Sequence, residues 1–226
     1  MQQILNEKQR AVIPVAAFTA NGDMTRLNAA LNDGLDAGLT INEIKEILVQ
    51  LYAYAGFPRS LNALGAFMQI LEQRAERGIQ DETGKAASPF PDSWNSLEDG
   101  TRNQTRLVGQ PVSGPLFEFA PAIDQFLKSH LFGDIFQRDT LDWQTRELAT
   151  ISALAALSGV NGQLKSHYSM SLQTGLTAEQ LGDFIKVIQH KCGTDTAANA
   201  RTVLHEVIPQ THRDSAPAQH PTEEKK

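Results

Sequence analysis

Glu147 and His167 have the residue types and the spacing of an acid–base pair, because they lie 20 positions apart in the chain. The sequence between them predicts two consecutive helices that meet near Gly159. With a rise of about 1.5 Å per residue, the second helix brings His167 back to within a turn or two of Glu147. A carboxylate beside an imidazole orients the ring for general acid–base catalysis. A structural role stays open, because the helix dipole favours a glutamate in the first turns and a single histidine is commonly a boundary residue.

A second group of residues could bind a substrate carboxylate. The segment QLYAYAGFPRSLNA, residues 50–63, contains Tyr54, Arg59 and Asn62, and Arg146 directly precedes Glu147. Arginine near aromatic side chains can hold a carboxylate through two parallel hydrogen bonds. The alternative is helix–helix packing with Arg59 at the boundary and Arg146 in solvent, and the residues alone favour this alternative.

No motif indicates a bound cofactor or metal ion. The chain has no glycine-rich nucleotide loop, no GxSxG serine motif and no cysteine–histidine set with the spacing of zinc ligands. A single cysteine, Cys192, excludes an intramolecular disulfide, and its place near the end of an apolar helix favours burial over reactivity. We therefore expect chemistry without a metal or a cofactor.

Composition and charge narrow the classes of partner. A net charge of −6 over 226 residues argues against nucleic acid, which requires a concentrated basic face. No apolar run approaches the ~20 residues of a membrane-spanning helix. The first residues, MQQILNEKQR, lack the pattern of a secretory signal. We expect a small-molecule substrate and a cytoplasmic location, or a periplasmic one if a signal peptide was removed.

The chain contains an internal repeat. A shift of 137 positions aligns Leu27 with Leu164 and keeps register over the following residues, and upstream the shift is 136. The other matches include Gly38 with Gly175, Thr40 with Thr177, Gly56 with Gly193, Leu5 with Leu141 and Arg10 with Arg146. The positions that correspond to Glu147 and His167 are Ala11 and Ala30. The first repeat therefore lacks the pair and is expected to supply walls to one site.

Both repeats show the apolar period and the capping residues of helices, so the predicted class is all-α, with two helical units packed as a pseudo-dimer. The first repeat covers residues 1–78 and the second covers 121–210, including one further amphipathic helix over residues 119–139. Residues 79–120 are rich in Gly, Pro, Ser, Asp and Asn, which predicts a mostly loop-like connection. Residues 211–226 are polar without apolar period and are predicted to be a disordered tail.

Two stretches of the chain resemble a known family. RELATISALAALSGVNGQLKSHYSMSLQTGLTAEQL, residues 146–181, resembles the core motif of the carboxymuconolactone decarboxylase family, and EIKEILVQLYAYAGFPRSLNAL, residues 43–64, resembles the following segment. The resemblance implies an all-α fold like that of the alkyl hydroperoxidase D proteins, in ring-like oligomers. If one two-repeat chain replaces two subunits, a hexameric ring becomes a homotrimer.

The resemblance also implies two kinds of possible chemistry, because the family has a peroxidase branch and a decarboxylase branch. The peroxidase branch of the family has two cysteines ahead of the histidine, at the positions that Val160 and Gln163 occupy here. Neither residue can form a thiolate, so dithiol chemistry at this turn is excluded. The decarboxylase branch keeps the glutamate and the histidine, which match Glu147 and His167. His167 would then deliver the proton, and Glu147 would orient the imidazole of His167. Arg59 or Arg146 would hold the carboxylate of the substrate.

Three functional hypotheses follow. The first is a cofactor-independent decarboxylase or related lyase that acts on a small carboxylated lactone. The second is a relative that carries a peroxiredoxin-type description without thiol activity. The third is a non-enzymatic oligomer that binds a small acid.

Overall fold

The structure, a computed structural model, describes residues 4–208, so the tail predicted at 211–226 lies outside the described residues. The described chain is helical, and the predicted all-α class with two repeats is confirmed. The first repeat contains α1 (Glu7–Asn21), α2 (Met24–Asp36), α3 (Ile41–Gln50), α4 (Tyr52–Ala55) and α5 (Phe57–Glu76). The second contains α9 (Trp143–Ala156), α10 (Asn161–Gln173), α11 (Ala178–Cys192) and α12 (Thr194–His205).

Capping residues set the ends of equivalent helices in the two repeats. Thr40 begins α3 and Thr177 begins α11, each with a side-chain oxygen that accepts from a backbone N–H three residues later. In both helices the third residue, Glu43 or Gln180, reciprocates to the threonine N–H and completes a capping box. Asp142 caps α9, because its side-chain oxygen accepts from the backbone N–H of Thr145. Local sequence therefore specifies where these helices start.

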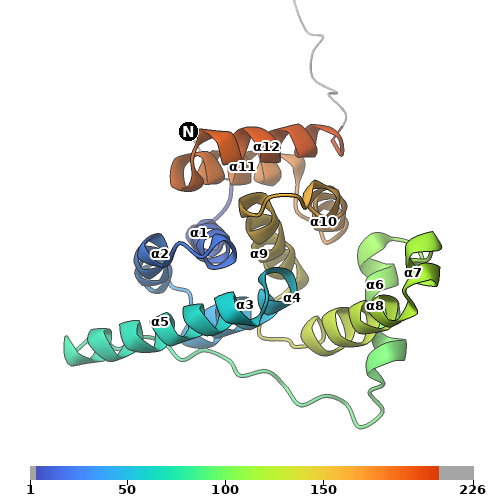
Figure 1. Cartoon of the computed structure of the whole chain (residues 1–226). Helices are drawn as coiled ribbons and strands as arrows, with labels where there is room; N and C mark the ends of the chain where they lie inside the picture. The colour runs from blue at the N-terminus through green and yellow to red at the C-terminus, as the bar shows by residue number, and fades with distance from the viewer. Residues whose placement is uncertain (1–3, 209–226) are drawn as a thin grey trace, which may run out of the picture.

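Helices α1 and α9 form the centre of the molecule, where they pack against each other across the two repeats. All residues of α1 from Ala11 to Ala20 are buried, and so are all residues of α9 from Arg146 to Ala155. Alanines at many of these positions let the two helices approach closely. In Figure 1, α11 and α12 cover one side of this central pair, and α3, α4 and α5 cover the other. The buried stretch of α1 is apolar except for Thr19, whereas α9 also buries Arg146, Glu147, Thr150 and Ser152, so its polar side chains need partners inside the protein.

Two ion pairs cross between the repeats and correspond to each other. Arg146 Nη2 lies 2.8 Å from Glu46 Oε1, and Arg10 Nη1 lies 2.6 Å from Asp183 Oδ2. The repeat aligns Arg10 with Arg146 and, by the 137-residue shift, Glu46 with Asp183. Each arginine therefore reaches into the opposite repeat, which is the reciprocal contact that a two-fold axis produces.

Three α-helices and a π-helix lie between α5 and α9. Two of them, α6 (Ser96–Val108) and α7 (Pro115–Phe119), lie within residues 79–120, which were predicted to be mostly loop. The α6 sequence is so polar that only Gly100, Gln104 and Leu107 are buried, and this sparse apolar pattern gave no sign of a helix. The Asn95 side chain accepts from the N–H groups of Leu97 and Glu98 and starts the helix.

The single helix predicted over residues 119–139 is divided in the structure. Pro121 starts α8 (Pro121–Phe126), which continues into the π-helix η1 (Leu127–Ile135). η1 packs most extensively against α6, not against the second repeat. The contact requires two glycines, because a Cβ atom at Gly100 would overlap the Lys128 carbonyl and one at Gly133 would overlap the Ser96 carbonyl.

Removing each cross-repeat arginine should have unequal effects on stability. We expect Arg146→Met to reduce the free energy of unfolding by about 3 kcal/mol or more, because it leaves polar groups of the fully buried network without a partner. Arg10→Met should cost about 1 kcal/mol, since its side chain is 29% exposed. Urea denaturation of the two variants measures the difference, and equal costs would contradict it.

Candidate functional site

The predicted pair of Glu147 and His167 is brought together in the structure. His167 Nδ1 lies 2.8 Å from Glu147 Oε2, and the two side chains are 8% and 0% exposed. Glu147 comes from the buried face of α9, and His167 comes from α10 after the turn at Gly159, whose φ of +78° favours glycine. The spacing of 20 residues therefore produces the contact that it predicts.

Tyr54 approaches the same pair from the first repeat. Its ring stands edge-on to the imidazole of His167, with centroids 5.6 Å apart and an angle of 79° between the planes. Burial raises the pKa of the Tyr54 phenol, and the negative charge of Glu147 raises it further. The phenol therefore stays neutral and keeps its proton as a donor. The first repeat, which lacks a Glu–His pair, still contributes a side chain to the pair in the second.

Two polar atoms around the pair are buried without a partner. Within residues 4–208, neither Glu147 Oε1 nor the Tyr54 hydroxyl has a hydrogen-bond partner. The nearby Thr150 hydroxyl donates its proton to the Arg146 carbonyl. Buried polar atoms in folded proteins are nearly always paired, so each exception requires an explanation. A ligand or water molecule that hydrogen-bonds to the Glu147 oxygen and the Tyr54 hydroxyl would explain both exceptions.

The geometry assigns separate tasks to the two imidazole nitrogens. When His167 is neutral, Nδ1–H donates to the Glu147 carboxylate, and Nε2 is left as the acceptor. Protonation makes Nε2 a donor while the carboxylate stabilises the imidazolium. The pair can thus take up and deliver a proton without changing its own contact.

Arg146 lies beside the pair but its guanidinium is already engaged. It is fully buried, and donates to Glu46, to Gln50 Oε1 at 2.8 Å and to the Arg138 carbonyl at 2.6 Å. Burial opposes ionisation of Glu46, but hydrogen bonds from Arg138 and Arg146 outweigh it and lower the carboxyl pKa. The expected solvated position of Arg146 is wrong, because both Nη atoms are engaged within the protein, and within residues 4–208 only its Nε is left without a hydrogen-bond partner.

Arg59 and Asn62 lie apart from the pair. The Arg59 guanidinium lies next to Gly22, in the turn between α1 and α2, and Asn62 is exposed on α5. Among the hydrogen bonds and ion pairs of the described residues, none connects either side chain to Glu147, His167 or Tyr54. Of the four predicted substrate-binding residues, the structure places Tyr54 alone against the imidazole.

Gln50 is a site residue that sequence reasoning missed. Its amide donates to the Thr150 hydroxyl and to the Arg146 carbonyl, both at 2.9 Å, and it is fully buried. Gln50 ends α3, one helical turn before Tyr54, so its hydrogen bonds connect the junction of α3 and α4 to α9. A glutamine within the apolar run ILVQLY was the available signal, because a buried amide must be hydrogen-bonded.

The inserted segment covers the site on the side of Met170, one turn after His167. Met170 packs into a separate hydrophobic cluster formed with residues of α6, η1 and the following turn, and Tyr54 also contacts this cluster. The buried cluster members are Leu107, Leu131, Phe132, Ile135, Phe136 and Met170. A hydrogen bond between the Tyr52 hydroxyl and His130 Nε2 joins α4 to η1. The insertion is therefore part of the wall around the pair.

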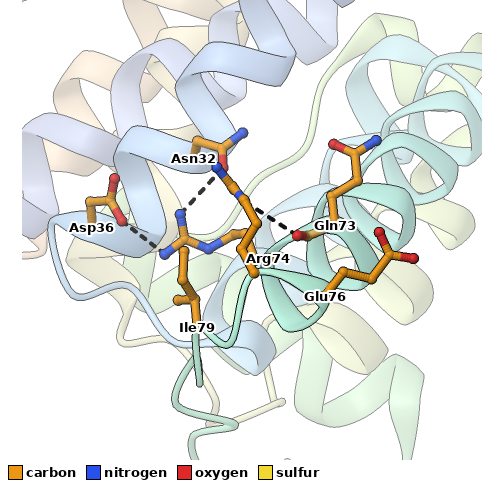
Figure 2. Close-up of a pocket in the computed structure, with 7 residues that line it drawn as sticks. Asn32, Asp36, Gln73, Arg74, Glu76 and Ile79 are labelled. Atoms are coloured by element: carbon orange, nitrogen blue, oxygen red, sulfur yellow. Dashed lines mark hydrogen bonds and ion pairs between the residues drawn. The ribbon is translucent and has the colours of Figure 1, made fainter.

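Two surface hollows lie away from the pair. One, drawn in Figure 2, lies between α2 and α5 and has a volume of about 660 Å³. There Arg74 Nη2 lies 2.8 Å from Asp36, and Nη1 lies 3.2 Å from Asn32. Asp81 binds the same guanidinium. With its donors occupied in this way, Arg74 is not available to an anion. A second hollow of about 560 Å³ lies beside Trp143 and Arg106.

Neither a metal site nor a membrane span is found in the part of the chain that the structure describes. Residues 4–208 contain no group of three or more His, Cys, Asp or Glu side chains placed to bind a metal ion. None of the described helices combines the length and apolarity needed to cross a bilayer. Burial raises the pKa of the Cys192 thiol to about 11, so this cysteine stays protonated near neutral pH.

Comparison with protein families agrees with this architecture. The carboxymuconolactone decarboxylase family matches residues 2–69 and 121–206, one stretch in each repeat. The chain belongs to this family, as a tandem member with two family units. No curated protein matches the chain. The inserted helices α6 and α7 lie between the two matched stretches.

Two buried tyrosines should make the fold sensitive to alkaline pH. Burial raises the pKa of Tyr54 and of Tyr168 above the usual value near 10. Above pH 10 the unfolded chain then loses protons that the folded chain keeps, so stability falls as pH rises. We expect the free energy of unfolding to drop by up to about 1.4 kcal/mol per pH unit for each tyrosine.

Denaturant titrations at pH 9 to 11 measure this slope. Tyr54→Phe should remove one tyrosine's share of the pH dependence, because phenylalanine cannot ionise. Tyr168→Phe should remove the other share, although it also deletes a 3.1 Å hydrogen bond to the Ala200 carbonyl. An unchanged slope in the double variant would refute the assignment.

Proposed function

We propose that the protein is a cofactor-independent decarboxylase that acts on a small carboxylated lactone. The observation that carries this proposal is the buried Glu147–His167 contact with two unpaired polar atoms beside it. Family membership supports decarboxylase chemistry, and Val160 and Gln163 at the cysteine positions count against thiol chemistry. The Glu147 oxygen and the Tyr54 hydroxyl offer a ligand one acceptor and one donor beside the imidazole.

The proposed reaction needs a proton and a stabilised oxyanion. When the bond between the carboxylate and the lactone ring breaks, CO₂ leaves. The electron pair of the broken bond moves into the ring and the lactone carbonyl. The Tyr54 hydroxyl, neutral and unpaired, donates to the oxygen that becomes negative. His167 Nε2–H then delivers a proton to carbon, and Glu147 stabilises the imidazolium before transfer. Solvent returns the proton to His167 afterwards.

Loss of carboxymuconolactone absorbance with purified protein tests this reaction, with CO₂ release as the second readout. We expect His167→Ala to lower kcat by about 10²- to 10⁴-fold, because the proton donor is removed. Tyr54→Phe should lower it by about 10²-fold through loss of the oxyanion donor. His205→Ala changes an exposed histidine on α12 and should leave the rate unchanged.

Other outcomes separate the remaining hypotheses. Failure of the wild-type protein to turn the lactone over would reject this substrate and favour a protein that binds a small acid. Peroxide consumption with a dithiol donor would contradict the interpretation of Val160 and Gln163. To test Glu147 as the positioning residue, ¹⁵N NMR of the imidazole in Glu147→Leu should show loss of the fixed Nδ1–H tautomer.

We also propose that the chain assembles as a homotrimer in the cytoplasm. Support comes from an exposed apolar stripe on α5, where Phe57, Leu61 and Met68 are 61%, 60% and 58% exposed. These residues share one face, since they lie four and seven positions apart. A further exposed aromatic pair, Phe119 and Phe126, lies on α7 and α8. Contiguous apolar surface of this kind is typical of protein interfaces.

Mass photometry or light scattering measures the assembly. We expect a species of three chains, each of 24.8 kDa. A charge at the centre of the stripe, as in Leu61→Glu or Met68→Glu, should shift the population to smaller species, because it would be buried without a partner. Glu72→Gln, an exposed change on the same helix, is the matched control. A monomer in the wild type would contradict the proposal.

A further inference from the structure

A third cavity, of about 170 Å³, lies between α1, α2 and the end of α11. Its apolar residues are Pro14, Phe18, Ala29 and Ala30, and its charged or titratable residues are Arg26, Asp33, His190 and Lys191. At ~30 Å³ for each water molecule, the volume equals that of five or six waters. The cavity therefore has room for a small organic molecule.

The internal repeat places this cavity at the position equivalent to the Glu147–His167 site. A shift of 137 residues aligns Ala30 with His167 and Lys191 with Tyr54, and the shift of 136 aligns Pro14 with Thr150. Ala11 occupies the position of Glu147 on the central helix α1. The two arrangements are built from equivalent helices, α1, α2 and α11 in one and α9, α10 and α4 in the other. The cavity is thus the counterpart of the candidate site, with two alanines in place of its acid–base pair.

The residues around the cavity suit an anion with an apolar body. Phe18 is 3% exposed and Ala30 likewise, so the floor is apolar. The Arg26 guanidinium lies 4.8 Å from the centre of the Phe18 ring, which places a cation directly above an aromatic surface. Lys191 and His190 add two further nitrogen groups from the end of α11.

The acidic groups near the cavity leave these cations available. Asp33 Oδ2 lies 3.5 Å from Lys191 Nζ, with side chains 61% and 39% exposed, and an exposed pair at this distance is weak. Asp23 Oδ2 binds Arg26 Nε at 2.7 Å, while Arg26 Nη1 makes one 3.4 Å contact with the Lys191 carbonyl. A carboxylate ligand can thus contact Nη2 of Arg26 and the Lys191 ammonium without displacing Asp23.

We propose that this cavity is a second, non-catalytic binding site for a small carboxylate with a flat apolar body. The carboxylate lies between Arg26 and Lys191, and the apolar part lies against Phe18 and Ala30. The site binds without turnover, because Ala11 and Ala30 stand at the positions that Glu147 and His167 occupy in the second repeat. This inference does not depend on the reaction proposed for His167.

Titration of the ¹⁵N-labelled protein with benzoate tests the site, and benzamide is the neutral probe of nearly the same shape. We expect saturable shifts at the amides of Ala29, Ala30 and His190 with benzoate and at least 10-fold weaker binding of benzamide. The double variant Arg26→Gln, Lys191→Gln should weaken benzoate binding at least 10-fold. Ala29→Leu keeps every charge and fills the mouth of the cavity, so it should also abolish these shifts.

Two controls separate this site from general charge effects and from the Glu147–His167 site. The variant Arg102→Gln, Lys165→Gln removes two exposed cations elsewhere and should leave benzoate binding unchanged. His167→Ala should bind benzoate at the cavity as the wild type does. Equal binding of benzoate and benzamide, full binding by the Arg26/Lys191 variant, or shifts confined to Tyr54 and Met170 would each overturn the proposal.

Discussion

The buried ion pair between Arg146 and Glu46 is the contact on which the candidate site depends. Arg146 directly precedes Glu147, so the position of its side chain fixes the turn of α9 that presents the Glu147 carboxylate to His167. Gln50 extends the same network from α3 toward Thr150, and Tyr54 follows one turn later. One network between the repeats therefore positions both the carboxylate behind His167 and the phenol beside it. A buried charge pair of this kind is costly to disrupt from either side.

The two repeats share their architecture and differ at the positions of Glu147 and His167. The arginine ion pairs, the threonine capping boxes and the buried central helices occur in both halves. The acid–base pair occurs in one, and the equivalent positions in the other hold alanines. Because packing across the interface needs both halves, the first repeat is retained whether or not it reacts. It supplies Tyr54 to one site and the walls of a separate cavity.

Local signals were sufficient for much of the fold, and for the contact between Glu147 and His167. Helix starts at Asp142, Thr40 and Thr177 follow from short-range hydrogen bonds, which the sequence reveals directly. The ion-pair partner of Arg146 could not be predicted from the sequence. Glu46 lies 100 positions away, and the two side chains meet only because the repeats pack against each other.

The inserted helices were missed for a related reason. The Asn95 cap of α6 is a local signal, but without an apolar period it does not indicate a helix, and the close approach of Gly100 to η1 depends on packing. The sequence did not indicate that η1 is a π-helix, since its apolar pattern resembles that of an α-helix.

The central packing of α1 against α9 also constrains how the protein is made. Synthesis proceeds from the N-terminus at about 5–20 residues per second, so roughly 7–27 s pass between completion of α1 and completion of α9. During that interval the apolar surface of α1 has no α9 to cover it. The nascent first repeat then exposes the apolar surface of α1, which is the kind of surface that promotes association between unfinished chains.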